Sequence, residues 1–455
     1  MKFDYLVLIF LWLFLSNNVK AQKWDVFEVD DGIKPSLEID TNGTPHIAYM
    51  LEALSGFIKH AEFNGSGFDI TNIHTGYFYG PLDIAIDNNN EPHIIYHNHD
   101  EEDLNHAFRS SNQWTIERVS DSGHDGWDGV MLIDSDNTIH VSSVDPSGFS
   151  GIGVEYATRT VSWAVESIAS VSLMYANGTS IVIDGIGTPS IAYFDDTQLD
   201  LKYATKVSGL WIHSTVDRDG DVGRFPDMVI DKFGKYHIAY YQDLGNGTGS
   251  VKYAFLENGQ WQINTIDNLN NVELGFSGAR HIVSLKYVEA DDKFFISYGD
   301  KKVIKYAFKE GNNWLSEFVI DETDSNIILG QQTSMDIDSE GIPHITYFEV
   351  NIPGGTIKYA VKDPTITPLA DLNDINDFKI FPNPSENWFT IDLDFLTNRK
   401  IAIEIIDMNG AVVKQWKMTL QSNQVHLSLN HLKEGLYLVR LTNKGKILES
   451  RLLIK

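Results

Sequence analysis

Residues 225–267 read FPDMVIDKFGKYHIAYYQDLGNGTGSVKYAFLENGQWQINTID, and altered copies of this text recur along most of the chain. The stretch contains four short runs rich in Ile, Val, Tyr and Trp, which are separated by Gly, Asn and Asp. Runs of this kind are typical of β-strands joined by tight turns. The repeat unit is therefore predicted to be a four-stranded antiparallel meander.

The copies can be counted on the third run, where an aromatic residue or a histidine precedes an alanine. Seven such pairs occur, 46 to 53 residues apart. Four strands per unit at this spacing are typical of a β-propeller, in which each blade is buried against its neighbours. The predicted fold class is all-β, a seven-bladed β-propeller followed by a small antiparallel β-sandwich. The pairs are His60-Ala61, His106-Ala107, Tyr156-Ala157, Tyr203-Ala204, Tyr253-Ala254, Tyr306-Ala307 and Tyr359-Ala360.

The ring is expected to close by joining two distant parts of the chain. The fourth run carries Trp in the second to sixth copies, but nothing resembling a fourth run follows Tyr359-Ala360 in the seventh copy. Residues 23–30, KWDVFEVD, read as a fourth strand that has no first three. We expect this segment to complete the seventh blade, because the pairing removes an open sheet edge.

The net charge of the chain limits the classes of molecule that it can bind. The chain has 455 residues and a net charge of -28, with 22% charged and 42% hydrophobic residues. The negative charge argues against nucleic acid and anionic membrane surfaces as partners, since both would be repelled. An anionic sugar held by a few local cations remains compatible with it. The plainest explanation of the acidity is solubility outside the cell.

The predicted layout has four parts. Residues 1–21 combine Lys2, an apolar run and a small-residue site ending at Ala21, which predicts a cleavable secretory signal peptide. Residues 22–361 are the predicted propeller, residues 362–377 a Pro- and Asp-rich linker, and residues 378–455 the sandwich. The chain contains no cysteine, so this exported protein is stabilised without disulfides.

The C-terminal sandwich carries three blocks, FKIFPNPSENWFTID, IEIIDMNGAVVKQW and LKEGLYLVRLTNKGK, followed by a terminal RLLIK. These blocks resemble the C-terminal sorting domain of the type IX secretion system of Bacteroidetes. The resemblance implies a partner, the type IX secretion machinery. It also implies a protein that passes through the periplasm and is secreted or held at the cell surface.

Chemistry is expected on the propeller face that gathers the loops between blades and the loops between second and third strands. The Asp-x-x-Gly turns, such as residues 231–234, lie on the opposite face and are assigned a structural role because most blades repeat them. Residues that differ between blades on the first face are the candidates, because His and Tyr can transfer protons and Arg can hold a carboxylate. The candidate catalytic residues are His97, His99, His124, Tyr193, Arg224 and Tyr241.

Each candidate type has a plainer interpretation. The tyrosines of the repeat, Tyr240, Tyr298 and Tyr347 in particular, are expected to be packing residues, and the three histidines could be surface or metal-binding residues. His97, His99 and Asp100 could join His106 or His124 around zinc, but His106 occupies the repeated third-run position. The residues after Asp217 resemble the start of a calcium loop without its required Gly and Glu. No complete metal motif is present, so no cofactor is predicted, and bound Ca²⁺ or Zn²⁺ stays open.

The run His93-Ile94-Ile95-Tyr96-His97-Asn98-His99-Asp100, followed by Leu104-Asn105-His106-Ala107, resembles the BNR-type repeats of secreted propellers, including ulvan lyases and related enzymes acting on ulvan oligosaccharides. The resemblance implies β-elimination on a uronic acid, with His and Tyr for proton transfer and Arg to neutralise the carboxylate. It predicts an extracellular carbon–oxygen lyase that either cleaves a chain or dehydrates its terminal uronic acid.

Two alternatives come from related propellers. A sialidase needs three arginines, whereas only Arg224 and at most Arg280 can be placed on this face. A non-catalytic lectin-like propeller could use the same face, although a lectin would repeat its binding residues in several blades. Both main hypotheses predict an anionic polysaccharide or oligosaccharide as ligand, no nucleic acid, and a monomer.

Overall fold

The computed structural model describes residues 24–51, 56–120, 126–145, 153–170, 178–270, 272, 282–321, 328–329, 332–351, 354–362, 379–381, 385, 388–392, 400–407, 411–419, 424–429, 432–443 and 446–454. Within these ranges the chain forms strands and turns, and no helix there is long and apolar enough to span a bilayer. Two compact units are present, Lys23–Asp363 and a second that contains Pro364–Lys455. The predicted signal peptide and all but the first residue of the predicted linker lie outside the described residues.

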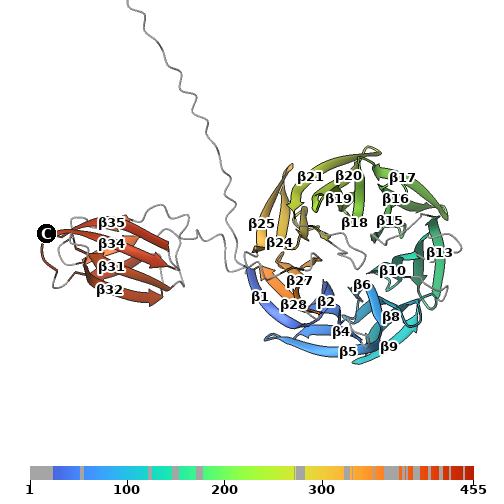
Figure 1. The fold of residues 1–455 in the computed structure, drawn as a ribbon, viewed down its shortest axis with the longest axis horizontal. Helices are drawn as coiled ribbons and strands as arrows, with labels where there is room; N and C mark the ends of the chain where they lie inside the picture. The colour runs from blue at the N-terminus through green and yellow to red at the C-terminus, as the bar shows by residue number, and fades with distance from the viewer. Residues whose placement is uncertain are drawn as a thin grey trace, which may run out of the picture. The chain divides into compact units, whose positions relative to one another are not determined.

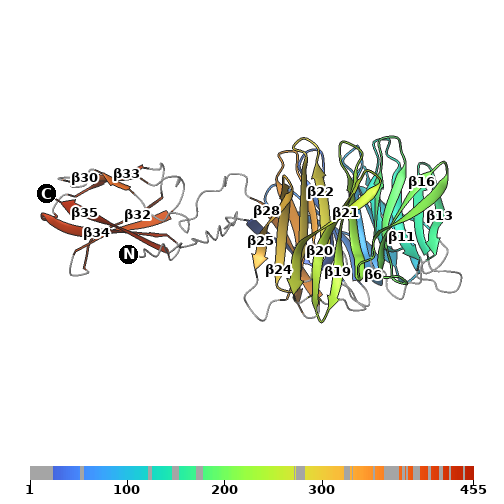
Figure 2. The ribbon, with the colours of Figure 1, turned by 90° about the horizontal axis from the view of Figure 1, so that it is seen from above.

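The larger unit contains seven four-stranded antiparallel sheets arranged as blades around a centre (Figure 1). In each blade the first strand lies nearest the centre, and the strands run roughly along the axis of the ring (Figure 2). The predicted seven-bladed β-propeller is therefore confirmed.

The first blade contains β2 (Ile33–Ile39), β3 (Pro45–Leu51), β4 (Gly56–Phe63) and β5 (Phe68–Gly76), and the second contains β6 (Phe78–Ile86), β7 (Pro92–Asn98), β8 (Asp103–Ser110) and β9 (Gln113–Arg118). The third contains β10 (Trp127–Ile133), β11 (Ile139–Asp145), β12 (Gly153–Arg159) and β13 (Trp163–Ser170), and the fourth contains β14 (Thr179–Ile183), β15 (Pro189–Asp195), β16 (Asp200–Val207) and β17 (Leu210–Asp217). The fifth contains β18 (Asp221–Ile230), β19 (Tyr236–Gly245), β20 (Thr248–Glu257) and β21 (Gln260–Asn270), and the sixth contains β22 (Val283–Val288), β23 (Lys293–Gly299), β24 (Val303–Glu310) and β25 (Asn313–Asp321). The seventh contains β26 (Ser334–Ile337), β27 (Pro343–Asn351), β28 (Gly354–Lys362) and the N-terminal β1 (Trp24–Asp31).

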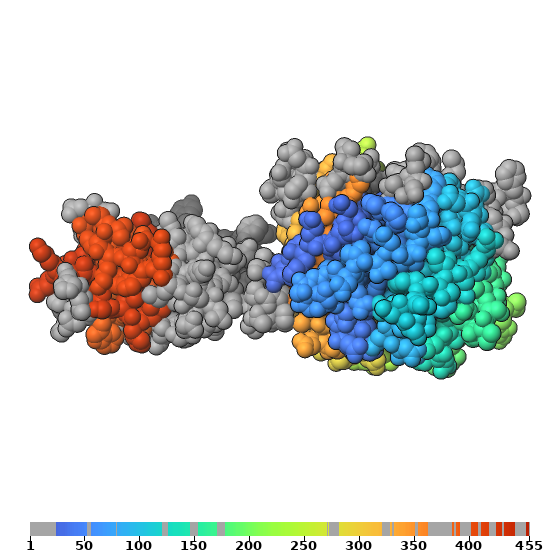
Figure 3. All heavy atoms as spheres, turned by 90° about the horizontal axis from the view of Figure 1, so that it is seen from below, coloured from blue at the N-terminus to red at the C-terminus, as the bar shows by residue number. Residues whose placement is uncertain are grey.

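The ring closes as predicted, through β1. This strand pairs antiparallel with β28 from Trp24 opposite Lys362 to Asp31 opposite Thr356. In the space-filling view the blue N-terminal residues lie beside the orange residues of the seventh blade (Figure 3). The pairing covers the β28 edge that would otherwise remain open.

Aromatic contacts join every pair of neighbouring blades. The third-strand aromatic or histidine of one blade meets a fourth-strand ring of the next blade nearly edge to face, with ring centroids between 5.1 and 5.6 Å apart. Such contacts bury large apolar areas and favour one relative orientation of the rings. The third-strand ring and the fourth-strand ring, which both recur in the sequence repeat, therefore contact each other across blade boundaries. The pairs are His60–Trp114, His106–Trp163, Tyr156–Trp211, Tyr203–Trp261, Tyr253–Trp314, Tyr306–Trp24 and Tyr359–Phe68.

Polar contacts join the innermost strands. At each of the seven boundaries a side-chain oxygen of one blade accepts a hydrogen bond from a backbone N–H of the next, at 2.7 to 3.4 Å. Between the third and fourth blades, the N–H of Gly178, directly before β14, donates to Asp128 Oδ2 at 3.2 Å. These N–H groups belong to sheet edges and need partners when they are buried. The donors and acceptors at the other six boundaries are Ile84 to Ser36, Met131 to Asp83, Met228 to Ser180, Leu285 to Asp227, Met335 to Ser284 and Leu37 to Ser334.

The repeated Asp-x-x-Gly turns have the structural role expected of them. In the first, Asp40 Oδ1 accepts hydrogen bonds from the N–H groups of Asn42 and Thr44, at 2.9 and 2.7 Å. Gly43 has φ of 83°, a left-handed conformation that glycine adopts without strain. The turn joins the first and second strands on the face opposite the predicted site.

The second unit is a small sandwich of two sheets. One sheet contains β29 (Lys379–Phe381), β30 (Trp388–Asp392) and β33 (Gln424–Ser428), and the other contains β32 (Val412–Thr419), β31 (Lys400–Ile406), β34 (Gly435–Asn443) and β35 (Lys446–Ile454). Phe389 and Ile391 of the first sheet pack in one buried cluster with Ile403, Val439 and Leu452 of the second. The predicted β-sandwich is therefore confirmed.

Candidate functional site

The predicted site residues lie on the propeller face where first strands begin and second strands end, which we call the junction face. The ladder between β6 and β7 shows the arrangement, because Phe78 at the start of β6 lies opposite Asn98 at the end of β7. The junction face also carries the loops between blades. Side chains from two neighbouring blades can therefore meet there.

In the second blade, Tyr77 and His99 face each other at this end of the sheet. The His99 N–H donates to the Tyr77 carbonyl at 3.0 Å, and the Tyr77 N–H donates to Asp100 Oδ2 at 2.8 Å. The two rings lie edge to face with centroids 4.7 Å apart. Both side chains are half-buried, so a ligand on the junction face can contact a histidine and a phenol together.

His97 lies behind this pair rather than at the surface. Its side chain is 1% exposed, and its ring centroid lies 6.1 Å from that of His99 and 5.6 Å from that of Trp127 in the third blade. Apolar or aromatic side chains fill the same second-strand position in five other blades. His97 is therefore placed to act on His99 more readily than on a ligand. The corresponding residues are Met50, Val144, Phe194, Tyr241 and Phe348.

Three other blade boundaries show what the repeat normally builds next to this position. A second-strand tyrosine hydroxyl and a third-strand lysine both donate to one aspartate at the end of the preceding blade's fourth strand, at 2.6 to 2.9 Å. The aspartate charge is thereby neutralised, in a buried pair for Lys252 and Asp217 and in partly exposed pairs in the other two sets. The sets are Tyr49, Lys59 and Asp30; Tyr240, Lys252 and Asp217; and Tyr298, Lys305 and Asp267. They confirm Tyr240 and Tyr298 as packing residues.

The second blade replaces this ionic set by a neutral one. His74 occupies the aspartate position, Asn105 the lysine position, and Tyr96 the tyrosine position. His74 Nδ1 and the Tyr96 hydroxyl are 2.8 Å apart, and burial lowers the pKa of His74 and raises that of Tyr96. The His74 imidazole is half-buried and the Tyr96 phenol is buried. A neutral imidazole hydrogen-bonded to a neutral phenol therefore takes the place of the ion pair at this boundary.

Sequence reasoning missed His74, Tyr77, Asn105 and Trp127. Aligning the fourth strands would have found His74, because aspartate fills its position before the first, fifth and sixth blades. Tyr77 had no such signal, since the loop that carries it has no repeated spacing.

Tyr193 belongs to a separate pair in the fourth blade. Its hydroxyl lies 3.1 Å from His213 Nδ1, and burial raises the pKa of Tyr193 to about 12. Burial also lowers the pKa of His213. Tyr193 is only 4% exposed, so it reaches a ligand less easily than Tyr77 does.

Arg224 and Tyr241 lie opposite each other in the fifth blade. Arg224 donates from Nε and Nη2 to the two carboxylate oxygens of Asp221, at 2.8 and 2.7 Å, and its guanidinium lies 4.7 Å from the centroid of the Phe194 ring. The Tyr241 side chain is fully buried, and its hydroxyl donates to the Thr248 carbonyl at 3.2 Å. Burial raises the pKa of Tyr241. Arg224 can therefore hold a substrate carboxylate only in competition with Asp221.

His124 and Arg280 lie outside the described residues. The predicted histidines thus occur in the second blade and the loop after it, Tyr193 occurs in the fourth blade, and Arg224 and Tyr241 occur in the fifth.

The metal sites considered from the sequence are not supported by the described side chains. His106 is buried between His93 Nδ1 at 2.9 Å and Glu117 Oε1 at 2.9 Å, in keeping with its expected packing role. The Asp217 carboxylate accepts hydrogen bonds from Tyr240 and Lys252 instead of forming a calcium loop. Among the described residues, one group of three potential ligands stands close enough for a metal ion, His46, His60 and Glu62.

The central channel has a volume of about 450 Å³ and is lined by the first strands of all seven blades. Lys286 Nζ lies 3.3 Å from both Glu38 Oε2 and Asp336 Oδ1. Burial, followed by the nearby Asp336 charge, raises the pKa of Glu38 to about 8, and burial raises that of Asp83 to about 6. Because Asp83 also accepts hydrogen bonds that join neighbouring blades, we assign this cluster to the stability of the ring.

Residues 379–455 match the family model of the secretion system C-terminal sorting domain. This match confirms the predicted sorting tail. The protein is therefore secreted to the cell surface or the extracellular space. The search of curated proteins found no match.

One solved structure supports the propeller assignment, and two others are similar at lower TM-scores. A family PL25 ulvan lyase bound to -[GlcA(1-4)Rha3S]- is 12% identical with a TM-score of 0.50, covering 74% of this chain and 95% of its own. A second structure of a PL25 ulvan lyase is 11% identical with a TM-score of 0.49, covering 74% and 95%. The Aleuria aurantia lectin is 13% identical with a TM-score of 0.45, covering 65% and 99%. The first likeness supports the propeller fold of this chain, and a shared fold does not by itself assign an activity.

Proposed function

We propose that the propeller is an extracellular carbohydrate-active enzyme, a carbon–oxygen lyase that performs β-elimination on uronic acids of an anionic, ulvan-like polysaccharide or its oligosaccharides. The observation that carries this proposal is the group of neutral proton-transfer residues in the second blade. Tyr77 and His99 are accessible there, and His74 at the end of the first blade forms a hydrogen-bonded pair with Tyr96 of the second.

The elimination needs a base and an acid on the same sugar ring. The base removes the proton from C5, the electron pair forms a C4–C5 double bond, the C4–oxygen bond breaks, and the acid protonates the departing oxygen. We assign His99 as the base and Tyr77 as the acid, because their rings lie 4.7 Å apart and both are half-buried. The departing oxygen belongs either to the next sugar, which cleaves the chain, or to a terminal hydroxyl, which releases water.

A uronate loses its C5 proton readily only when its carboxylate is neutralised. Arg224 in the fifth blade is too far from His99 in the second blade to bind the carboxylate of the reacting sugar. We propose that Arg224 holds the carboxylate of another uronate of the same chain, for which it must leave Asp221 to form the bidentate pair. Its position in the fifth blade requires a substrate that extends across the junction face from the second blade. The proposal therefore favours an oligosaccharide or a polysaccharide over a single sugar.

The test is incubation with a panel of uronate glycans while the ultraviolet absorbance of the 4,5-unsaturated product is followed. His99→Gln and Tyr77→Phe should each reduce turnover roughly a hundredfold. Tyr287→Phe and His426→Gln are matched controls, because Tyr287 borders the hairpin of the opposite face and His426 is exposed in the sorting domain; neither should change turnover.

A second pair of variants separates the two groups of candidates. Tyr193→Phe should leave most of the activity if the second blade is the catalytic centre, whereas Arg224→Lys should raise KM because Lys cannot form the bidentate pair. Loss of turnover in Tyr193→Phe alone would move the site to the fourth blade. Tight glycan binding without any unsaturated product would support the lectin alternative.

A further inference from the structure

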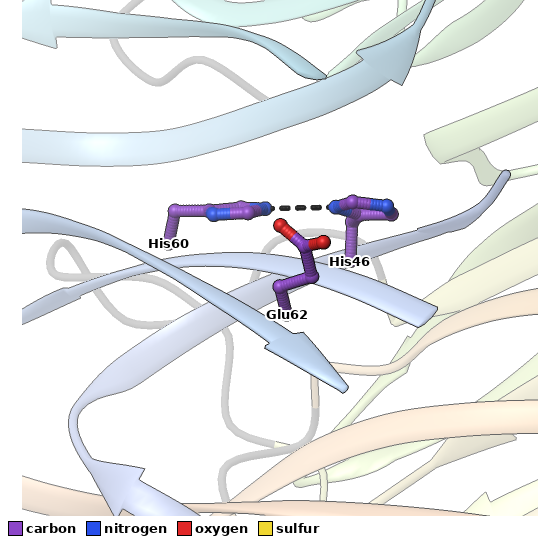
Figure 4. Close-up of side chains that lie close together, drawn as sticks. All are labelled: His46, His60 and Glu62. Carbon is purple, nitrogen blue, oxygen red and sulfur yellow. Dashed lines mark hydrogen bonds between the residues drawn. The ribbon is translucent and has the colours of Figure 1, made fainter. Parts of the chain in front are cut away.

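We propose that His46, His60 and Glu62 of the first blade bind one Zn²⁺ ion. One ligand atom from each of the three residues lies within 4.8 Å of the others, and His46 Nδ1 and His60 Nε2 are 3.0 Å apart. Figure 4 shows the two rings end to end, with the Glu62 carboxylate directed at the gap between them. Two imidazoles, one carboxylate and an open fourth position form a donor set that zinc commonly uses.

The geometry needs little adjustment. Two nitrogens at zinc–nitrogen distances of about 2.0–2.1 Å around a tetrahedral ion are about 3.3 Å apart. The observed separation of 3.0 Å is slightly shorter, so small shifts of the two rings would admit the ion. Both histidines are 1% exposed, which shields their side of the site from bulk water.

The other blades show why His46 offers a lone pair to the ion. In the third and fifth blades the histidines at this position are His140 and His237. Their Nε2 atoms lie 3.2 and 3.1 Å from the turn aspartates. Their Nδ1 atoms accept hydrogen bonds from third-strand tyrosine hydroxyls at 2.7 and 2.6 Å, respectively. In the first blade Asp40 Oδ2 again faces His46 Nε2, at 3.8 Å, while His60 replaces the tyrosine. An aspartate on Nε2 holds the proton there and directs Nδ1 toward a metal ion.

The first blade also contains an unsatisfied group that an ion would help to resolve. His46 Nε2 is buried and has no hydrogen-bond partner. Metal binding at Nδ1 requires the proton to reside on Nε2, where the Asp40 carboxylate at 3.8 Å can attract it. The ion would therefore favour one tautomer of His46 and draw that proton toward Asp40.

Glu62 is shared with a neighbouring cation. Arg109 Nη1 contacts Glu62 Oε2, and Arg109 Nε donates to Glu91 Oε2 at 2.7 Å. We therefore assign Glu62 Oε1 as the zinc ligand. The second carboxylate, Glu91, keeps the guanidinium partly neutralised beside the ion.

The second blade provides an internal comparison. His93 and His106 form a similar pair at 2.9 Å, but the residue that corresponds to Glu62 is Phe108. Glu117 lies 2.9 Å from His106 Nδ1, which is not the nitrogen that faces His93. This pair lacks a third ligand, so we expect it to hold a proton between its rings and no metal ion.

The experiment measures zinc in untagged full-length protein, prepared both from zinc-supplemented culture and by refolding from urea with Zn²⁺. Elemental analysis after extensive dialysis should give one zinc per chain, and removal by a chelator during refolding should lower the melting temperature. Protein refolded with Co²⁺ should show the intense visible absorption of a tetrahedral site.

Two equivalent substitutions locate the ion. His60→Tyr introduces the residue that most blades use at this position, so the variant should fold, and it should lose the zinc. His106→Tyr makes the same change in the second blade and should retain it. Absence of zinc from the wild-type protein in both preparations would overturn the proposal. So would zinc retained in the double variant His60→Tyr/Glu62→Gln. Loss of zinc from the single variant His106→Tyr would also overturn it. None of these outcomes depends on the proposed lyase activity.

Discussion

Trp24 of the N-terminal strand lies against Tyr306 of the sixth blade, with ring centroids 5.5 Å apart and planes 70° apart. This is the contact that a fourth-strand tryptophan makes with the preceding blade elsewhere in the ring, for example Trp314 with Tyr253. The N-terminal strand therefore contributes the full set of blade contacts, both its ladder to β28 and its ring. Closure of the propeller depends on a segment far in sequence from the rest of the seventh blade.

Removal of the Trp24 ring should destabilise the whole propeller. Trp24→Ala leaves a cavity beside Tyr306 and is expected to lower the free energy of unfolding by about 3–5 kcal/mol. Urea unfolding followed by tryptophan fluorescence measures this. Val26→Ala on the same strand is the control, because Val26 is 41% exposed and should cost about 0.5 kcal/mol or less. Equal effects of the two substitutions would contradict the closure contact.

The aspartate–lysine–tyrosine sets should be sensitive to removal of one charge. In the set of the fifth blade, the side chains of Lys252 and Asp217 are 7% and 4% exposed, so Lys252→Met leaves a buried aspartate without its cation. The expected loss is about 3–5 kcal/mol of unfolding free energy. Lys252→Met with Asp217→Leu should recover part of it, because no unpaired charge remains. A double variant less stable than the single one would contradict this account.

The buried second-strand histidines should make the propeller sensitive to acid. Burial lowers the pKa of His93 and of His237 to about 4 in the folded protein. The Asp231 carboxylate beside His237 acts in the opposite direction, but burial has the larger effect on the pKa of His237. The unfolded chain binds protons near pH 6.5, so it binds more protons than the folded protein between pH 6.5 and 4. Stability is therefore complete above about pH 6.5 and falls toward pH 4, by up to about 1.4 kcal/mol per pH unit for each such histidine.

The pH dependence can be assigned to one residue with His237→Ser, which copies the serine that the fourth blade has at this position. Urea unfolding at pH 7 and pH 5 should show a smaller difference for this variant than for the wild-type protein. An unchanged difference would mean that His237 does not contribute.

Much of the propeller could be predicted because its repeat marks contact one another. The third-strand rings recur at every boundary and meet a tryptophan at six of them and Phe68 at the seventh. The count of blades and the closing role of residues 23–30 therefore followed from their spacing. The site was harder to predict. His97 belongs to the apolar series of Met50 and Phe194 and is buried, while His74 becomes visible as an exception only once its position is matched to Asp30 and Asp217 of other blades. The Arg224–Asp221 pair could not be foreseen, because it depends on a local bulge in β18.

The sorting tail should be separable from the propeller. Deletion of residues 379–455 is expected to leave the melting temperature of the propeller unchanged, because the tail has its own buried core. The truncated protein should accumulate in the periplasm instead of the medium or the cell surface. Cell fractionation followed by immunoblotting measures this, and a full yield of truncated protein outside the cell would contradict the role of the tail.

The most direct test of the central claim restores the ordinary repeat in the second blade. His74→Asp combined with Asn105→Lys recreates the ionic set found around Tyr49, Tyr240 and Tyr298, so the variant should remain as stable as the wild-type protein. The measurement is the initial rate of unsaturated-uronate formation on the uronate glycan that the wild-type protein turns over fastest. The account predicts a rate reduced roughly a hundredfold or more. A folded double variant with the wild-type rate, or a wild-type protein that yields no unsaturated product from any uronate glycan, would contradict it.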